Sequence, residues 1–107
     1  MFISVKPLSV NEAYTGRRFK TDKHREWCKE VAVLLPLKSI PDGPLRLDLT
    51  FGYSSHAADI DNGLKTILDA LQKKYGFNDN RIYELHVWKD VVPKGKEFID
   101  IHIKPKQ

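Results

Sequence analysis

Three aspartates and one lysine in the second half of the chain are of the types that bind a divalent metal ion. Asp59 and Asp61 lie two residues apart, Lys65 follows four residues later, and Asp79 comes after the next apolar stretch. Carboxylates that meet raise each other's pKa unless a cation neutralises them. Hard oxygen ligands of this kind favour magnesium or manganese. Such a site can hydrolyse a phosphodiester, because the metal activates water while a lysine stabilises the charge of the transition state.

The same residues also permit an interpretation without any catalytic role. A helix that begins with Asp61 as its N-cap places Asp61, Lys65 and Asp69 on one polar stripe, one turn apart. Asp59 then lies in a solvated loop, and Lys65 pairs with Asp69 on the surface. On spacing alone this structural interpretation is the stronger one. A calcium-binding loop is excluded, because counting from Asp59 puts glycine at the fifth position and alanine at the twelfth.

Two amphipathic helices are indicated by apolar residues at helical spacing. The first begins with Thr21 or Asp22 as its N-cap and ends at Pro36. Its apolar residues are Trp27, Val31, Leu34 and Leu35. The second ends at Gly76, a typical C-terminal cap. Its apolar stripe consists of Leu64, Ile67, Leu68 and Leu71. Gly63, in the first turn of this helix, costs up to about 1 kcal/mol of helix propensity unless another part of the chain approaches it closely.

Four strands are indicated by alternating or short apolar runs. They cover residues 2–5, 45–51, 82–89 and 98–104. The last two are expected to form a hairpin around a turn at residues 93–95. The order strand, helix, strand, helix, strand, strand predicts a single α+β domain over residues 1–107. In it, a mixed sheet of about four strands packs against two helices.

The composition is that of a globular protein. The chain has 107 residues, 41% of them hydrophobic and 30% charged, with a single cysteine. One cysteine excludes an intrachain disulfide framework and a cysteine-rich zinc module. No apolar run approaches the roughly 18 residues that cross a bilayer, and the first ten residues lack the features of a signal peptide. We therefore expect a soluble protein of a reducing compartment, the cytoplasm.

The net charge of +4 is concentrated toward the ends of the chain. Residues 1–40 carry eight Lys and Arg against four acids, whereas residues 41–80 carry four against six. The densest basic segment contains Arg17, Arg18, Lys20, Lys23 and Arg25. Such a segment can bind backbone phosphates by releasing counterions, without reading base sequence. Tyr14 and Phe19 could stack on opened bases there, or the segment could be an ordinary solvated surface with Phe19 buried.

Residues 59–89, DIDNGLKTILDALQKKYGFNDNRIYELHVWK, resemble the signature of the RusA-type Holliday junction resolvases. The shared features are an Asp-x-Asp-Asn motif, a lysine one helical turn later, Asp-Ala-Leu, a turn with glycine, an acidic position, and an apolar strand that ends in lysine. Residues 10–21, VNEAYTGRRFKT, are similar to the N-terminal segment of that family, with its asparagine, tyrosine and basic residues. Several specified positions at fixed spacing discriminate far better than an isolated acidic pair. The resemblance therefore favours an enzyme.

The resemblance implies a role for each of the candidate site residues. Asp59 and Asp61 match the paired metal-binding aspartates of the family, and Lys65 matches its essential lysine. Asp79 matches the third catalytic carboxylate. One departure is Asn78, where the family often has a second acid beside that carboxylate. Since an amide carries no charge, we count three acidic ligands.

The resemblance further implies a homodimer that uses magnesium or manganese to place paired nicks in a four-way DNA junction during recombination and repair. Two symmetric cuts require two active sites, which a twofold dimer supplies. The implied DNA-binding residues are Asn11, Tyr14, Arg17, Arg18, Lys20 and Lys23. Resolvases this short occur in bacterial cells and in phages. Two alternatives stay open, namely a non-catalytic basic nucleic-acid-binding module and a nuclease for flaps or RNA hybrids.

Other residues with chemical potential are more simply structural. His24 and Cys28 lie four residues apart on the first helix, but no second pair completes a metal site, so we expect a helix-surface histidine and a half-buried thiol. Glu84 with His86, and His102, could join the carboxylates as base or ligand, but a position on the sheet surface is the simpler expectation. The two aromatic anchors expected in the core or at the dimer interface are Trp27 and Trp88.

Overall fold

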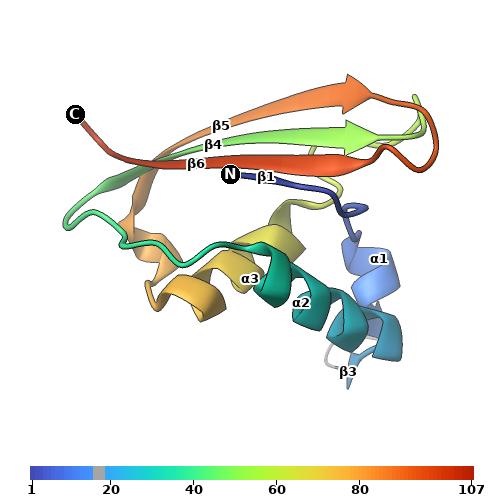
Figure 1. Ribbon diagram of the computed structural model, residues 1–107, viewed down its shortest axis with the longest axis horizontal. Helices are drawn as coiled ribbons and strands as arrows, with labels where there is room; N and C mark the ends of the chain where they lie inside the picture. Colours follow the sequence, from blue (N-terminus) through green and yellow to red (C-terminus); the bar gives the residue numbers. More distant parts are fainter. Residues whose placement is uncertain (16–18) are drawn as a thin grey trace.

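A four-stranded mixed sheet forms one layer of the molecule, and the helices cover one of its faces (Figure 1). The structure, a computed structural model, describes residues 1–15 and 19–107. The strands follow the order β1 (Phe2–Ile3), β6 (Phe98–Pro105), β4 (Leu45–Tyr53) and β5 (Ile82–Val91). β4 lies inside the sheet, antiparallel to β6 and parallel to β5. This architecture confirms the predicted α+β domain with a mixed sheet of four strands.

The predicted hairpin between the last two strands is wrong. β4 lies between β5 and β6 and pairs with both, so the two strands that follow each other in sequence are not neighbours. The reason is that α3 (Leu64–Tyr75) joins β4 to β5, and a strand-helix-strand connection makes its two strands parallel. β6 takes the other edge of β4, where Ile99, Ile101 and Ile103 become buried.

Both long helices agree with the sequence prediction over most of their length. α2 (Asp22–Leu34) has Thr21 as its N-cap, whose Oγ1 accepts a hydrogen bond from His24 N at 3.1 Å. α3 ends at Gly76, whose φ of 70° is the left-handed conformation that glycine adopts readily. The elements that the sequence did not predict are α1 (Val10–Ala13), β2 (Tyr14–Thr15), β3 (Phe19–Lys20) and the 3₁₀ helix η1 (Asp79–Arg81). No helix in the described residues has the length and apolar character to cross a membrane.

The apolar core fills the space between the sheet and the two long helices. Alternate residues of the two inner strands face it, namely Leu45, Leu47, Leu49, Phe51, Ile99, Ile101 and Ile103. Trp27 is buried among them, and its indole N–H donates to Lys6 O at 2.8 Å, as expected of a core tryptophan. Trp88 is 50% exposed and stacks beside His86 on the uncovered face of the sheet. Of the two positions expected for Trp88, the core is therefore wrong, and the dimer interface stays a prediction. His24 is buried and not on the helix surface, because Tyr14 packs against its ring.

The uncovered face of the sheet carries a network of ion pairs around one buried carboxylate. Asp48 accepts a hydrogen bond from Arg46 Nε at 2.9 Å and lies 3.4 Å from Lys104 Nζ. Glu84 joins the network through Lys106, at 3.1 Å. The hydrogen bond from Arg46 holds the pKa of Asp48 below its ordinary value, and Lys104 lowers that pKa further. The charges on this face therefore compensate one another.

Asp48→Asn should lower the free energy of unfolding at pH 7 by roughly 1 kcal/mol, because Arg46 and Lys104 lose their charged partner. The native pKa of Asp48 is lower than its ordinary value of 3.8, so the stabilisation is present above about pH 4 and is lost as the pH falls through the native pKa. The stability difference between wild type and variant should shrink from pH 7 to pH 2. Urea titrations across this range measure it, and a constant difference would contradict the network's role.

Candidate active site

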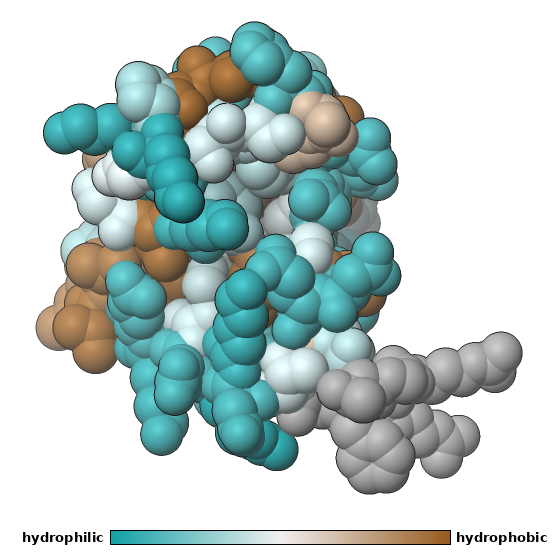
Figure 2. Space-filling model, turned by 90° about the vertical axis from the view of Figure 1, so that its right-hand side faces the viewer, coloured by the Kyte–Doolittle hydropathy of each residue, from teal (hydrophilic) through white to brown (hydrophobic). Residues whose placement is uncertain are grey.

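The loop of residues 54–63 joins β4 to α3 and carries two of the predicted metal ligands. Asp59 and Asp61 are both exposed there, beyond the end of β4. The backbone turns twice, because Asn62 N donates to Asp59 O at 3.0 Å and Leu64 N donates to Asp61 O at 3.0 Å. Figure 2 views the molecule from this end and shows a face dominated by hydrophilic side chains. The two carboxylates therefore lie on one solvent-facing turn.

Two side chains from neighbouring parallel strands anchor this loop on either side of the aspartates. Tyr53, the last residue of β4, accepts a hydrogen bond from Gly63 N through its phenol oxygen at 3.1 Å. Lys89 of β5 donates through Nζ to His56 O at 2.9 Å and to Ala58 O at 2.5 Å. The loop is therefore tied to the sheet both before and after the acidic pair.

The pKa of the Tyr53 phenol depends on burial and on the charges around it. Burial raises the pKa of Tyr53, and the negative charges of Asp61 and Asp59 raise that pKa further. The phenol consequently stays protonated at neutral pH and can donate to Ile60 O, which lies 3.4 Å away. Both carboxylates are close enough to the phenol to act on it, so they share one electrostatic environment.

Gly63, and not Asp61, is the N-cap of α3, so the predicted capping role of Asp61 is wrong. The reason is a close approach by a distant part of the chain. A Cβ atom on Gly63 would lie 2.9 Å from Pro7 Cβ, closer than ordinary packing allows, and 3.4 Å from Phe51 Cε1. This contact explains the glycine at a position where it weakens a helix. Because its carboxylate does not cap α3, Asp61 can bind a ligand in solvent.

Lys65 lies in the first turn of α3 and points to solvent. Its side chain is 57% exposed, and its Nζ lies 3.5 Å from Asp69 Oδ2. This distance confirms the surface pair predicted from the i, i+4 spacing. Such an exposed pair is weak, so the ammonium group can exchange Asp69 for a phosphate at little cost.

Asp79 lies at the other end of α3. It begins η1, and its backbone N–H donates to Gln72 Oε1 at 2.9 Å. Two residues later, Arg81 donates to Gly43 O at 3.2 and 3.0 Å, near the start of β4. Because β4 and β5 are parallel, the loop before α3 and the turn after it lie at opposite ends of the strands. The 12 residues of α3 alone span about 18 Å.

One chain therefore brings Asp59 and Asp61 onto the same loop but leaves Asp79 remote from them. Consistently, no three His, Cys, Asp or Glu side chains within residues 1–15 and 19–107 are grouped closely enough to hold a metal ion. The chain places two of the predicted carboxylate ligands at one end of the strands and the third at the other. Any site that uses all three needs more than one copy of this fold.

The predicted DNA-binding residues lie around α1 and the start of α2. Arg17, Arg18 and the side chain of Lys20 are outside the described part of the chain. Asn11 is exposed on α1, and Lys23 forms an ion pair with Glu12 that holds the pKa of that carboxyl below its usual value. The ring centroid of Tyr14 lies 5.2 Å from that of His24, and Tyr14 is half-buried, so its stacking on a base stays a prediction.

Two candidate groups do not join the aspartates. Glu84 and His86 pair with each other on the uncovered face of the sheet, where Glu84 also lies 3.9 Å from Arg46. His102 lies on the same face, 3.4 Å from Asp100. The loop with Asp59 and Asp61 is instead tied to residues of the helix-covered side, so the sheet-surface expectation for the histidines is confirmed.

The family profile described as endodeoxyribonuclease RusA matches residues 6–104 of the chain. The chain belongs to the RusA family. It is also 30% identical, over 118 aligned residues, to the crossover junction endodeoxyribonuclease RusA of Aquifex aeolicus. That alignment covers 100% of this chain and 91% of the relative. The resemblance seen in residues 10–21 and 59–89 is therefore confirmed as RusA family membership.

Tyr53 and Lys89 anchor the acidic loop, a role that the sequence patterns did not predict. Lys89 ends the apolar strand of the RusA-like motif, and Tyr53 ends the strand before the acidic loop. The signal that links them is topological. Once β4 and β5 are known to be parallel neighbours, their C-terminal residues must meet the loop that leaves β4.

Lys89→Met should reduce DNA cutting by roughly tenfold to a hundredfold, because the loop loses two hydrogen bonds and small displacements of reacting groups are costly. Lys89→Arg keeps donors at this position and should retain more activity. Single-turnover cleavage of a synthetic four-way junction measures both effects. Lys96→Met, at an exposed position between β5 and β6, is the matched control. Equal activity of the Met and Arg variants at position 89 would contradict the anchoring role.

Proposed function

We propose that this protein is a metal-dependent endonuclease that resolves four-way DNA junctions by hydrolysing phosphodiesters in opposed strands. The observation that carries the proposal is the anchored pair of Asp59 and Asp61, with Lys65 one turn into the following helix, in a chain of the RusA family. The relative in Aquifex aeolicus is named as a crossover junction nuclease, which supports the choice of a branched substrate.

Asp59 and Asp61 are the residues that would hold magnesium, or manganese in its place. Their oxygens suit such an ion, which typically takes one or two protein carboxylates and keeps its remaining positions for water and substrate phosphate. When bound, the ion lowers the pKa of a water molecule and offsets negative charge on the phosphate. Tyr53 and Lys89 hold the loop so that both carboxylates stay in place. Lys65 stabilises the charge of the transition state after it leaves Asp69.

Asp79 reaches the same site, in this proposal, from a second copy of the chain. Its place at the far end of the strands excludes it from the loop of its own chain. A twofold homodimer can bring the partner's Asp79 to Asp59 and Asp61, and symmetry then generates two identical sites. Two sites match two nicks, one in each opposed strand. Contacts from Asn11, Tyr14, Lys23 and the neighbouring basic residues would add affinity for the junction backbone.

Asp61→Asn should abolish nicking of a four-way junction, by at least about a hundredfold, and leave junction binding intact. Nicking is measured with magnesium, with manganese and with neither, and binding is measured by gel shift in calcium. In the same series, the midpoint of thermal unfolding should rise with manganese for wild type but not for the variant. A protein that shows neither metal-linked stabilisation nor cleavage would be a basic binding module instead.

A mixture of two inactive variants tests the shared site. Asp61→Asn and Asp79→Asn should each be inactive alone. In a mixed dimer, one site receives both substitutions and the other receives neither. Mixing should therefore restore nicking of one strand of each junction. About a quarter of the wild-type nicking rate is expected when dimers exchange freely, because half of the dimers are mixed and each mixed dimer has one intact site. Mixtures that stay inactive after subunit exchange, shown by native mass spectrometry, would place all three carboxylates within one chain.

A further inference from the structure

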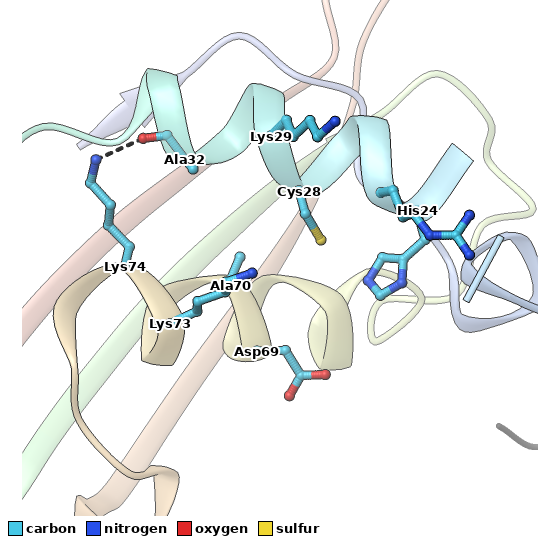
Figure 3. Close-up of a pocket in the computed structure, with 9 residues that line it drawn as sticks. His24, Cys28, Lys29, Ala32, Asp69, Ala70, Lys73 and Lys74 are labelled. Atoms are coloured by element: carbon cyan, nitrogen blue, oxygen red, sulfur yellow. Dashed lines mark hydrogen bonds between the residues drawn. The ribbon is translucent and has the colours of Figure 1, made fainter. Parts of the chain in front are cut away.

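The outer surface of the two long helices contains a groove (Figure 3) that the proposed active site does not use. It lies between α2 and α3 and has a cavity volume of about 520 Å³. Cys28 points from α2 toward α3, and Ala32 and Ala70 line the two walls (Figure 3). Since these three side chains are small, an extended ligand can approach the backbone of both helices.

The groove is strongly basic. Among the described residues, four cations line it, namely Arg25, Lys29, Lys73 and Lys74, against one acid, Asp69. Most of these charges have partners: Arg25 pairs with Asp22, Lys74 donates to Ala32 O at 2.8 Å, and Asp69 pairs with Lys65.

Lys29 of α2 and Lys73 of α3 line this groove from opposite helices without such partners. Both are exposed, and neither takes part in an ion pair within the described residues. Two uncompensated ammonium groups beside a concave surface attract an anion. This charge pattern differs from that of the uncovered sheet face, where the cations are paired with carboxylates.

The groove is continuous with the proposed active site along α3. Lys65, Asp69 and Lys73 follow one another at intervals of one turn, so they lie on one stripe of the helix. Asp69 belongs both to the Lys65 ion pair and to the wall of the groove. From Lys65 to Lys73 the helix rises about 12 Å. This distance corresponds to about three to four nucleotide steps of 3.4 Å along a DNA strand.

We propose that the groove between α2 and α3 binds the phosphodiester backbone of a duplex DNA arm, about three to four base pairs from the cleaved phosphate. Lys29 and Lys73 contact the phosphates, and the small side chains of Cys28, Ala32 and Ala70 leave room for the strand. The inference rests on the proposed function, because it assigns a second contact to the same substrate. It adds Lys29 and Lys73, which lie outside the basic segment from Arg17 to Arg25, to the residues that contact DNA.

The double variant Lys29→Gln with Lys73→Gln tests the groove. It should bind a four-way junction roughly tenfold more weakly at fixed salt, and the slope of log affinity against log salt should decrease by about two. Cleavage of saturating junction in a single turnover should stay within about twofold of wild type, since the groove holds no reacting group. Asp69→Asn should act in the opposite direction and tighten binding.

The matched control removes two charges from the other face of the molecule. Lys104→Gln with Lys106→Gln alters the ion-paired sheet face and should leave the salt slope unchanged. Thermal unfolding verifies that all variants fold. If the wild type binds and cuts junctions but the groove variant keeps the wild-type salt slope, the groove proposal alone is overturned. A wild type that neither binds nor cuts any junction would overturn the proposed function.

A scan of the DNA locates the contact. Junctions that carry one neutral methylphosphonate at successive positions should weaken wild-type binding at the positions that lie in the groove. At those positions a methylphosphonate should not weaken binding of the Lys29→Gln, Lys73→Gln variant, because this variant lacks the lysines that would contact the phosphates. If every position weakens both proteins equally, the lysines do not contact backbone phosphates and the proposal fails.

Discussion

The parallel pairing of β4 with β5 is the constraint on which the rest of the molecule depends. A helix must cross the sheet to connect two parallel strands, so α3 lies over the core, and its two ends lie at opposite ends of the strands. The acidic loop and the turn with Asp79 are the two ends of this one crossover. The same pairing brings Lys89 beside the residues that follow β4. Anchoring of the candidate site and separation of its carboxylates thus have a single cause.

Local patterns in the sequence were sufficient for most of the elements. Thr21 caps α2 and Gly76 ends α3 because the requirements of helix ends involve only nearby residues. Family membership also followed from short motifs at fixed spacing, and the Lys65 pair with Asp69 followed from helix geometry alone. The candidate ligands could be named from sequence for the same reason. Their arrangement in space could not, because it depends on strand order.

The predictions that failed all required knowledge of contacts between distant residues. The hairpin failed because β4 separates β5 from β6, which no spacing in residues 82–104 reveals. Gly63 takes the place predicted for Asp61 as the N-cap of α3, at a position where Pro7, more than fifty residues earlier, packs closely. The buried position of His24 depends on Tyr14, in an element that was not predicted.

The placing of two candidate carboxylate ligands before α3 and the third after it has a consequence for how activity depends on protein concentration. If the third carboxylate comes from a second copy, an isolated chain cannot cut, and the concentration of competent enzyme rises with the square of the chain concentration when dimers are scarce. A cell that makes little of the protein would then carry a nuclease that is inactive until two chains meet. Dilution alone would then abolish cleavage.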